Sequence, residues 1–101
     1  MEKFNNLLTK YKDTFLPKGN IKLLNEDEVR SIPLYVQLLS NGVPNSILIE
    51  TSDSIRILLK VTRQLFLEID GKKDHTNLAV LKNLSGKIVE DLRSNAISIH
   101  A

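Results

Sequence analysis

Cysteine and tryptophan are absent from this chain of 101 residues, and aromatic residues make up only 5% of it. The lack of cysteine excludes disulfide bonds, thiol catalysis, iron–sulfur clusters and thiolate zinc sites. The chain has 3 prolines and 4 glycines, without a repeat or a low-complexity segment. At this length, with 42% hydrophobic and 26% charged residues, we expect a single globular domain over residues 1–101.

Long apolar runs are also missing. Uninterrupted runs such as Ile57–Leu59 and Leu65–Leu67 are far shorter than the roughly 18 residues that a membrane-spanning helix needs. The segment Met1–Asn6 has no apolar stretch behind a basic region, so it does not have the pattern of a signal peptide. The sequence therefore predicts no membrane span and a cytoplasmic location.

Candidate catalytic groups are few. His75 lies in a polar turn and His100 next to the C-terminus, and neither lies in a pattern that places it beside a nucleophile. Asp70, Asp74 and His75 could gather a cation, but the run lacks the alternating oxygen ligands and the terminal glutamate of a calcium loop. The segment Ser85–Lys87 lacks the upstream glycine of a phosphate-binding loop. We therefore expect a chain that is not an enzyme and that needs no metal or cofactor.

Two segments have apolar residues at the spacing of a helical stripe. The first stripe consists of Phe4, Leu7, Leu8, Tyr11 and Phe15. The last consists of Leu78, Leu81, Leu84, Ile88 and Leu92. The first helix is expected to end near Leu16, because Pro17 disfavours a helical residue before it. Gly86 costs about 1 kcal/mol in the last helix, so either the helix breaks there or another helix approaches closely.

The region around Pro33 has two interpretations. Asn25 and Glu28 have the spacing of a capping box, which predicts that a helix starts there. Pro33 then either kinks this helix or starts a new one, after a short turn that ends near Ser31. Asn41-Gly42 supplies a left-handed terminator for this element.

The longest apolar element, Ile55–Ile69, fits two periods. Its apolar residues alternate like those of a strand apart from Arg63, and they also fit a helical template. We favour a helix, because a strand of about 15 residues would exceed the usual 3 to 10 and no turn residue interrupts the run.

Together these segments predict a mainly all-α fold, a compact antiparallel bundle of about four helices with at most a minor short β element. Three short segments could be extended, and their state stays open: Ile21–Leu24, Ile47–Glu50 and Ile97–His100.

The net charge of +2 conceals a segregation of charge along the chain. By residue count, residues 1–22 carry +3, residues 23–54 carry −4 and residues 55–101 carry +3. Such a distribution can orient a binding partner, but the acidic middle can equally neutralise the basic ends within one fold.

On the expected helix at 55–69, one narrow strip combines Arg56, Lys60, Arg63 and Leu67. Acids elsewhere in the fold can neutralise this strip, or it can bind a partner. The predicted protein-binding residues are Tyr35, Arg56, Lys60, Arg63 and Leu67, together with the apolar neighbours of Tyr35 near Pro33. The alternative is binding to a nucleic-acid backbone through Arg56, Lys60, Arg63, Lys72 and Lys73.

The sequence thus predicts a non-catalytic macromolecular-interaction module, an accessory or regulatory subunit that acts by protein–protein binding. Nucleic-acid binding is the alternative. Homo-oligomerisation is open as well, because the wide apolar arc of the helix expected at 55–69 could be covered by a second copy.

Overall fold

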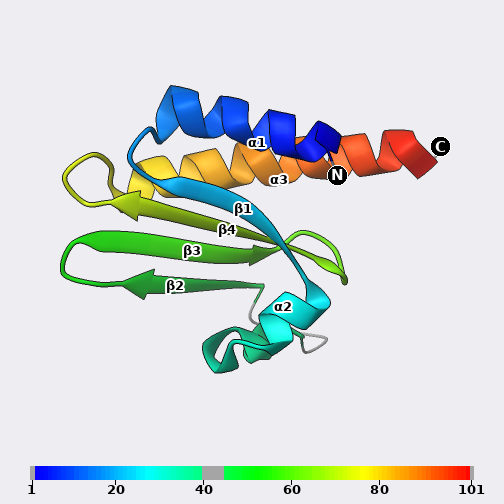
Figure 1. The fold of residues 1–101 in the computed structure, drawn as a ribbon, viewed down its shortest axis with the longest axis horizontal. Helices are drawn as coiled ribbons and strands as arrows, with labels where there is room; N and C mark the ends of the chain where they lie inside the picture. Colours follow the sequence, from blue (N-terminus) through cyan, green and yellow to red (C-terminus); the bar gives the residue numbers. More distant parts are fainter. Residues whose placement is uncertain (1, 40–44, 101) are drawn as a thin grey trace.

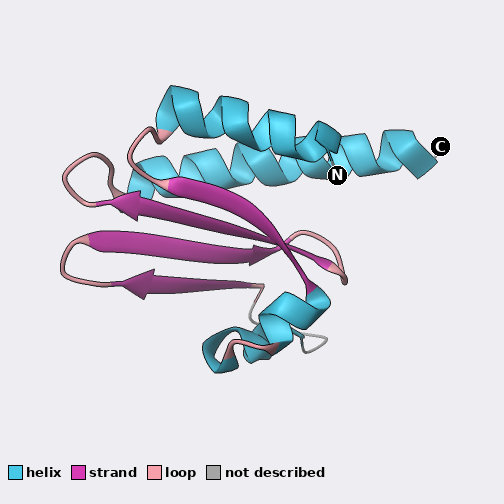
Figure 2. Ribbon diagram, in the orientation of Figure 1, coloured by secondary structure: helices cyan, strands magenta, loops and turns pink. Residues whose placement is uncertain are grey.

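A four-stranded antiparallel sheet lies at the centre of the molecule, in the order β1-β4-β3-β2 (Figures 1 and 2). The strands are β1 (Asn20–Asn25), β2 (Ser46–Glu50), β3 (Ser54–Lys60) and β4 (Leu65–Lys72). The helices are α1 (Glu2–Phe15), α2 (Glu26–Arg30), the 3-10 helix η1 (Pro33–Leu39) and α3 (Leu78–His100). The structure is a computed structural model that describes the backbone of residues 2–39 and 45–100 and the side chains of residues 6–39 and 45–94.

The expectation of a helical bundle is wrong, because the segment Ile55–Ile69 forms most of the β3–β4 hairpin rather than a helix. Both faces of this hairpin are covered, so apolar residues occur on both sides of each strand and imitate a helical pattern. The turn contains neither glycine nor proline. It is closed by hydrogen bonds from Val61 N to Leu65 O at 2.9 Å and from Gln64 N to Thr62 Oγ1 at 3.3 Å.

Of the three segments left open, Ile21–Leu24 lies in β1 and Ile47–Glu50 in β2, whereas the backbone of Ile97–His100 belongs to α3. Two of the three segments are therefore strands of the sheet. The Asn41-Gly42 terminator lies outside the described residues.

The local signals at the ends of α1 and α2 agree with the structure, and one of the two interpretations of Pro33 applies. α1 ends at Phe15, next to the expected Leu16, and Pro33 is the first residue of a new helix, η1. The capping box at the start of α2 is complete. Glu28 N donates to Asn25 Oδ1 at 2.8 Å, and Asn25 N donates to Glu28 Oε1 at 3.0 Å.

One face of the sheet is covered by α1 and α3, which lie side by side (Figure 1). α1 lies over β1, and α3 lies over β4 and β3. The buried residues between these layers are Leu8, Leu16, Ile21, Ile55, Ile57, Val61, Leu67, Ile69, Leu81, Leu84, Ile88 and Leu92. This layer does not extend over β2, for which no contact with either helix is found in the described parts of the chain.

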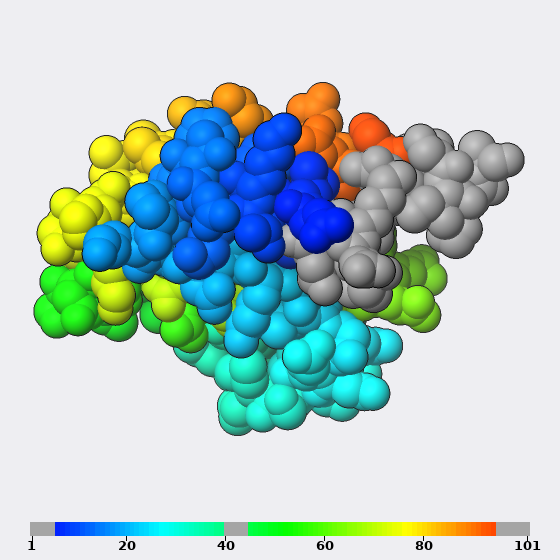
Figure 3. All heavy atoms as spheres, turned by 45° about the horizontal axis from the view of Figure 1, so that its top comes forward, coloured from blue at the N-terminus to red at the C-terminus, as the bar shows by residue number. Residues whose placement is uncertain are grey.

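α2 and η1 pack on the opposite face of the sheet and project from the body of the molecule (cyan in Figure 3). They bury a second cluster, which consists of Leu24, Val29, Tyr35, Leu38, Leu58 and Phe66. This cover is partial, and the polar residues Lys22, Arg56, Glu68 and Asp70 lie beside it on the same face.

Candidate functional site

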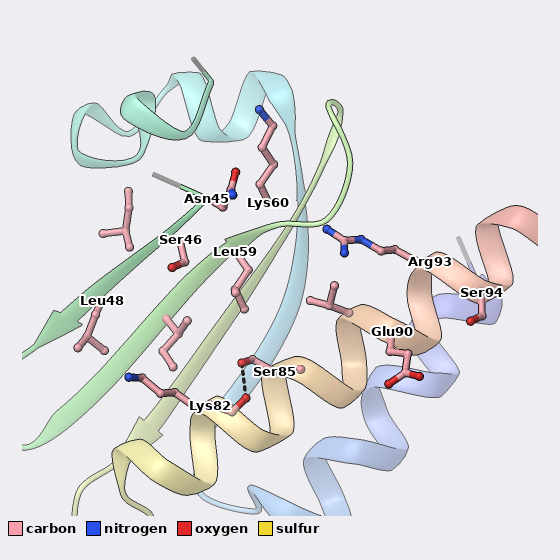
Figure 4. Close-up of a pocket in the computed structure, with 14 residues that line it drawn as sticks. Asn45, Ser46, Leu48, Leu59, Lys60, Lys82, Ser85, Glu90, Arg93 and Ser94 are labelled. Atoms are coloured by element: carbon pink, nitrogen blue, oxygen red, sulfur yellow. Dashed lines mark hydrogen bonds between the residues drawn. The ribbon is translucent and has the colours of Figure 1, made fainter. Parts of the chain in front are cut away.

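A groove with a volume of about 680 Å³ lies between the edge strand β2 and helix α3 (Figure 4). We call it the β2–α3 groove. It exists because the α1–α3 layer covers the sheet only as far as β3, so that the helix-facing side of β2 is left open. Leu48 on β2 consequently keeps 48% of its surface exposed.

The lining of the β2–α3 groove is mainly apolar. Leu48 of β2 and Ile57 and Leu59 of β3 form its floor. Its wall is one stripe of α3 at spacings of three and four residues, formed by Lys82, Ser85, Gly86, Val89 and Arg93. A concave apolar surface with charged groups only at its margin has the anatomy of a protein-binding site.

Because Gly86 has no side chain, it leaves open space at the α3 wall of the groove. Outside its own helical turn, no heavy atom of the described residues lies within 4 Å of the position that a Cβ would take. The helix continues through this glycine, and Ser85 Oγ is held by a hydrogen bond of 2.8 Å to Lys82 O. The close approach of another helix, one of the two sequence-based explanations for Gly86, is not found within the described part of this chain.

Charged side chains of α3 mark the two ends of the groove. Lys82 and Arg93 extend toward the open side of the sheet in Figure 4, whereas Glu90 points away from it. Arg93 Nε donates to Val61 O at 3.1 Å, which holds this guanidinium at the end of the groove near the β3–β4 turn. The groove is therefore apolar in the middle, with Lys82 at one end and Arg93 at the other, although Glu90 also belongs to its lining.

The backbone of β2 adds hydrogen-bonding groups beside the groove. Bonds from Lys60 N to Asn45 O and from Thr51 N to Ser54 O, both 2.9 Å, lie at the two ends of the β2–β3 pairing. Antiparallel pairs alternate between bonded and non-bonded positions, so the N–H and C=O groups of Ser46, Leu48 and Glu50 point to the outer edge. No other described segment pairs with that edge.

A polar network occupies the opposite face of the sheet. The Tyr35 hydroxyl donates to Glu68 Oε2 at 2.8 Å and accepts from Arg56 Nη1 at 3.1 Å. Arg56 Nη2 also bonds Asp70 Oδ2 at 3.1 Å, and Lys22 Nζ lies 3.6 Å from Glu68 Oε1. Burial raises the pKa of Tyr35, and the hydrogen bond with Tyr35 raises the pKa of Arg56 further above its usual value.

The network joins η1 to the sheet and pairs its acids with bases, which makes it a structural contact. Glu68 is 7% exposed, so its charge needs these partners. The described residues contain no group of three or more histidines, cysteines and acids that could hold a metal ion. His75 is exposed beside Asp74, and the side chain of His100 lies outside the described residues.

The structure does not bring the predicted binding residues together on one strip. Tyr35 and Leu67 are 1% and 0% exposed and belong to the two different cores. Arg56 belongs to the polar network, and Arg63 is exposed in the β3–β4 turn. Lys60 lies at the end of β3 and contributes to the lining of the groove.

Lys72 and Lys73 lie at the opposite end of the hairpin from Arg63, and Lys73 pairs with Glu50 at 3.0 Å. The residues that sequence reasoning missed are Leu48, Gly86 and Val89 in the groove. Gly86 was the available signal, because a glycine inside a helix is costly and needs a reason.

The fold has a match among solved structures. No family model matches the sequence, and no curated protein matches it at a significant level. The fold resembles that of MglC. The comparison is with the crystal structure of MglC from Myxococcus xanthus, at a TM-score of 0.51 and 13% sequence identity, over 83% of this chain and 98% of the MglC chain. At this identity, the likeness to MglC concerns the arrangement of helices and strands alone.

Among the described residues, none of the helices combines the length and the apolar character that crossing a bilayer requires.

Proposed function

We propose that this chain is a non-catalytic protein-interaction module, an accessory or regulatory subunit, and that the β2–α3 groove is its binding surface. The observation that carries the proposal is an open apolar groove beside an unpaired sheet edge. Exposed apolar side chains in a concave site, with charge at the margin, favour association with another protein. The fold likeness to MglC is compatible with this role and assigns no partner.

The η1 helix offers a further exposed apolar surface. Leu34 and Val36 are 52% and 41% exposed, while Tyr35 between them is buried. Of the residues expected to bind near Pro33, Leu34 and Val36 are therefore exposed for contact, whereas Tyr35 is not. We place the main surface in the groove, because there the apolar side chains are combined with a concave shape and unpaired backbone groups.

Nucleic-acid binding stays a sequence-based prediction. The five basic residues named for it lie at separate places on the fold, and two of them, Arg56 and Lys73, are paired with acids. This placement does not favour one phosphate-binding surface.

Photo-crosslinking in the native cell tests the proposed function. A photoreactive amino acid in place of Leu48, which is half exposed in the groove, should form an adduct with one protein. The same group in place of Ala79, an exposed position on α3 outside the groove, is the matched control. Equal labelling from the two positions, or no adduct from position 48, would contradict the proposal.

A further inference from the structure

We propose that the β2–α3 groove binds an extended segment of a partner protein, which adds as a fifth strand to the free edge of β2, inserts apolar side chains at alternate positions and has an acidic residue at each end. This inference rests on the proposed function and specifies the chemistry of the partner.

The first support is the edge of β2. Ser46, Leu48 and Glu50 direct their N–H and C=O groups outward, as the pairing with β3 requires. Natural proteins commonly guard such edges with lysine, proline or a bulge. Ser46–Glu50 contains neither lysine nor proline, and its pairing with β3 is continuous. The other edge strand, β1, has the exposed Lys22 at its middle. Of the two sheet edges in the described part of the chain, the β2 edge is therefore the one open to strand addition.

The second support is the position of the groove relative to that edge. A residue that pairs with Leu48 on an added strand places its side chain on the same face of the sheet as Leu48. That face is the helix-facing one, where the groove is open between Leu48 and α3. Alternate residues of the added strand would therefore point over the groove, which explains why an apolar side chain as exposed as Leu48 lies there.

The third support is Gly86. A glycine inside a helix lowers helix stability, and nothing within the described chain uses the space that this one leaves. A large side chain of the added strand that leans toward α3 would use it. The same space makes the site testable, because the Cβ of a residue that replaces Gly86 would meet no atom of the described chain within 4 Å outside its own helical turn.

The fourth support is that the distance between Lys82 and Arg93 on α3 matches the length of a strand that pairs with β2. Lys82 and Arg93 are eleven positions apart, close to three helical turns, so they share one face of α3 and lie about 16 Å apart along its axis. β2 has 5 residues, and an extended segment of this length spans about 16 Å. Both elements run along the long direction of the molecule in Figure 1. An acid at each end of a five-residue segment would thus meet Lys82 and Arg93.

The same charges disfavour a second copy of this chain as the occupant. Two copies paired through β2 would bring the cations of both α3 helices to one interface. Glu50, the acid of β2, already pairs with Lys73 at 3.0 Å. Self-pairing would therefore bring like charges together, whereas an acidic partner segment would bring opposite charges to Lys82 and Arg93.

Peptide selection provides the probe. Random 12-residue peptides displayed on phage are selected against the folded full chain, and the enriched peptides are synthesised. We expect apolar residues at alternate positions between two acids that are four positions apart, so that the acids lie on the same face of the extended segment. Gly86→Leu should weaken binding of these peptides at least tenfold, and Ala79→Leu should leave it unchanged. Lys82→Glu should also weaken binding, and replacing the facing acid of the peptide by lysine should restore it.

Amide hydrogen exchange then distinguishes the binding modes. Strand addition should slow exchange at Leu48 and Glu50, whose N–H groups point outward. Ile47 and Ile49, which already bond to β3, should change little. A helical peptide in the groove would leave the outward amides unprotected and would overturn the strand inference while the proposed function stands. Protection without peptide that rises with protein concentration would instead identify a second copy as the occupant.

Failure of the two proposals gives different results. If no peptide is enriched against the folded chain, the inference of a linear extended segment is wrong. The photo-crosslink at position 48 then still decides the proposed function. If the crosslink also fails, both proposals fall.

Discussion

The hydroxyl of Tyr35 donates a 2.8 Å hydrogen bond to the carboxylate of Glu68, which joins η1 to the central strand β4. Both side chains are buried, and Arg56 completes the contact from β3. The sequence suggested Tyr35 as a binding residue, whereas its position makes it a link between η1 and the sheet.

Tyr35→Phe tests the strength of this link. The variant keeps the ring in its core but leaves Glu68 without one hydrogen-bond partner, so the free energy of unfolding should fall by about 1–3 kcal/mol. Urea denaturation followed by circular dichroism measures the change. Val36→Ala, at a neighbouring exposed position, is the control and should stay within about 0.5 kcal/mol of the parent. Equal stability of Tyr35→Phe and the parent would show that the bond contributes nothing.

The two tyrosines of the chain should ionise at a higher pH than an unperturbed tyrosine. The hydrogen bond to Asp91 raises the pKa of Tyr11 to about 12, and burial raises the pKa of Tyr35. A folded pKa above the unfolded value of 10 means that the protonated phenol stabilises the fold. For Tyr11, this stabilisation is complete below pH 10 and is lost as the pH rises toward about 12.

Absorbance of tyrosinate near 295 nm measures both ionisations directly. Tyr11→Phe should leave a single transition that belongs to Tyr35, still above pH 10. It should also remove the Tyr11 contribution to the loss of stability between pH 10 and about 12. A transition of the parent at an ordinary tyrosine pKa would contradict the hydrogen bond between α1 and α3.

Gly86 and Gly19 should respond to alanine in opposite directions. At Gly86 the added Cβ meets open space and the helix gains propensity, so Gly86→Ala should stabilise the chain by about 0.5–1 kcal/mol. At Gly19 a Cβ would lie 2.3 Å from the backbone oxygen of Asp70, so Gly19→Ala should destabilise it. Thermal unfolding of the two variants checks the signs, and a loss of stability in Gly86→Ala would show that the space is not open.

Leu67 and Arg63 separate the observed hairpin from the helix that the sequence suggested. On the expected helical strip both would be exposed and tolerant of substitution. In the hairpin, Leu67 is fully buried and Arg63 lies in the exposed turn. Leu67→Ala should therefore cost about 2–5 kcal/mol, and Arg63→Ala less than about 0.5 kcal/mol. If Leu67→Ala and Arg63→Ala had similarly small effects in urea denaturation, the result would favour the expected helix over the hairpin.

Sequence reasoning identified the elements that have local signals. The stripe of α1 and the capping box at Asn25 depend on neighbouring residues, and both agree with the structure. For Pro33 the sequence left two interpretations open, and the structure shows the second, a new helix that starts at this residue. The hairpin was missed because Thr62–Gln64 turns without glycine or proline. The alternation of Ile55–Ile69 is visible in the sequence. However, both faces of the sheet are packed against helices, so apolar residues also occur at positions that would be polar in a strand with one exposed face.

The candidate site could not be predicted from the sequence either, because it also depends on tertiary packing. The groove depends on where the α1–α3 layer ends relative to β2, which no local pattern encodes. Only the cost of Gly86 within a helix pointed to it. Lys60 is the one predicted binding residue that the structure places in the lining of the groove.

The most direct test of the central claim is quantitative capture of protein partners from the native cell by three forms of the full chain. Gly86→Leu places a large side chain in the β2–α3 groove at a position where the added Cβ meets no atom of the described chain within 4 Å outside its own helical turn, and Ala79→Leu adds the same side chain elsewhere on α3. We expect one protein to be retained by the parent and by Ala79→Leu, and to be reduced at least tenfold on Gly86→Leu, with all three forms folded. Retention of the same partners by Gly86→Leu would show that the groove is not the binding surface.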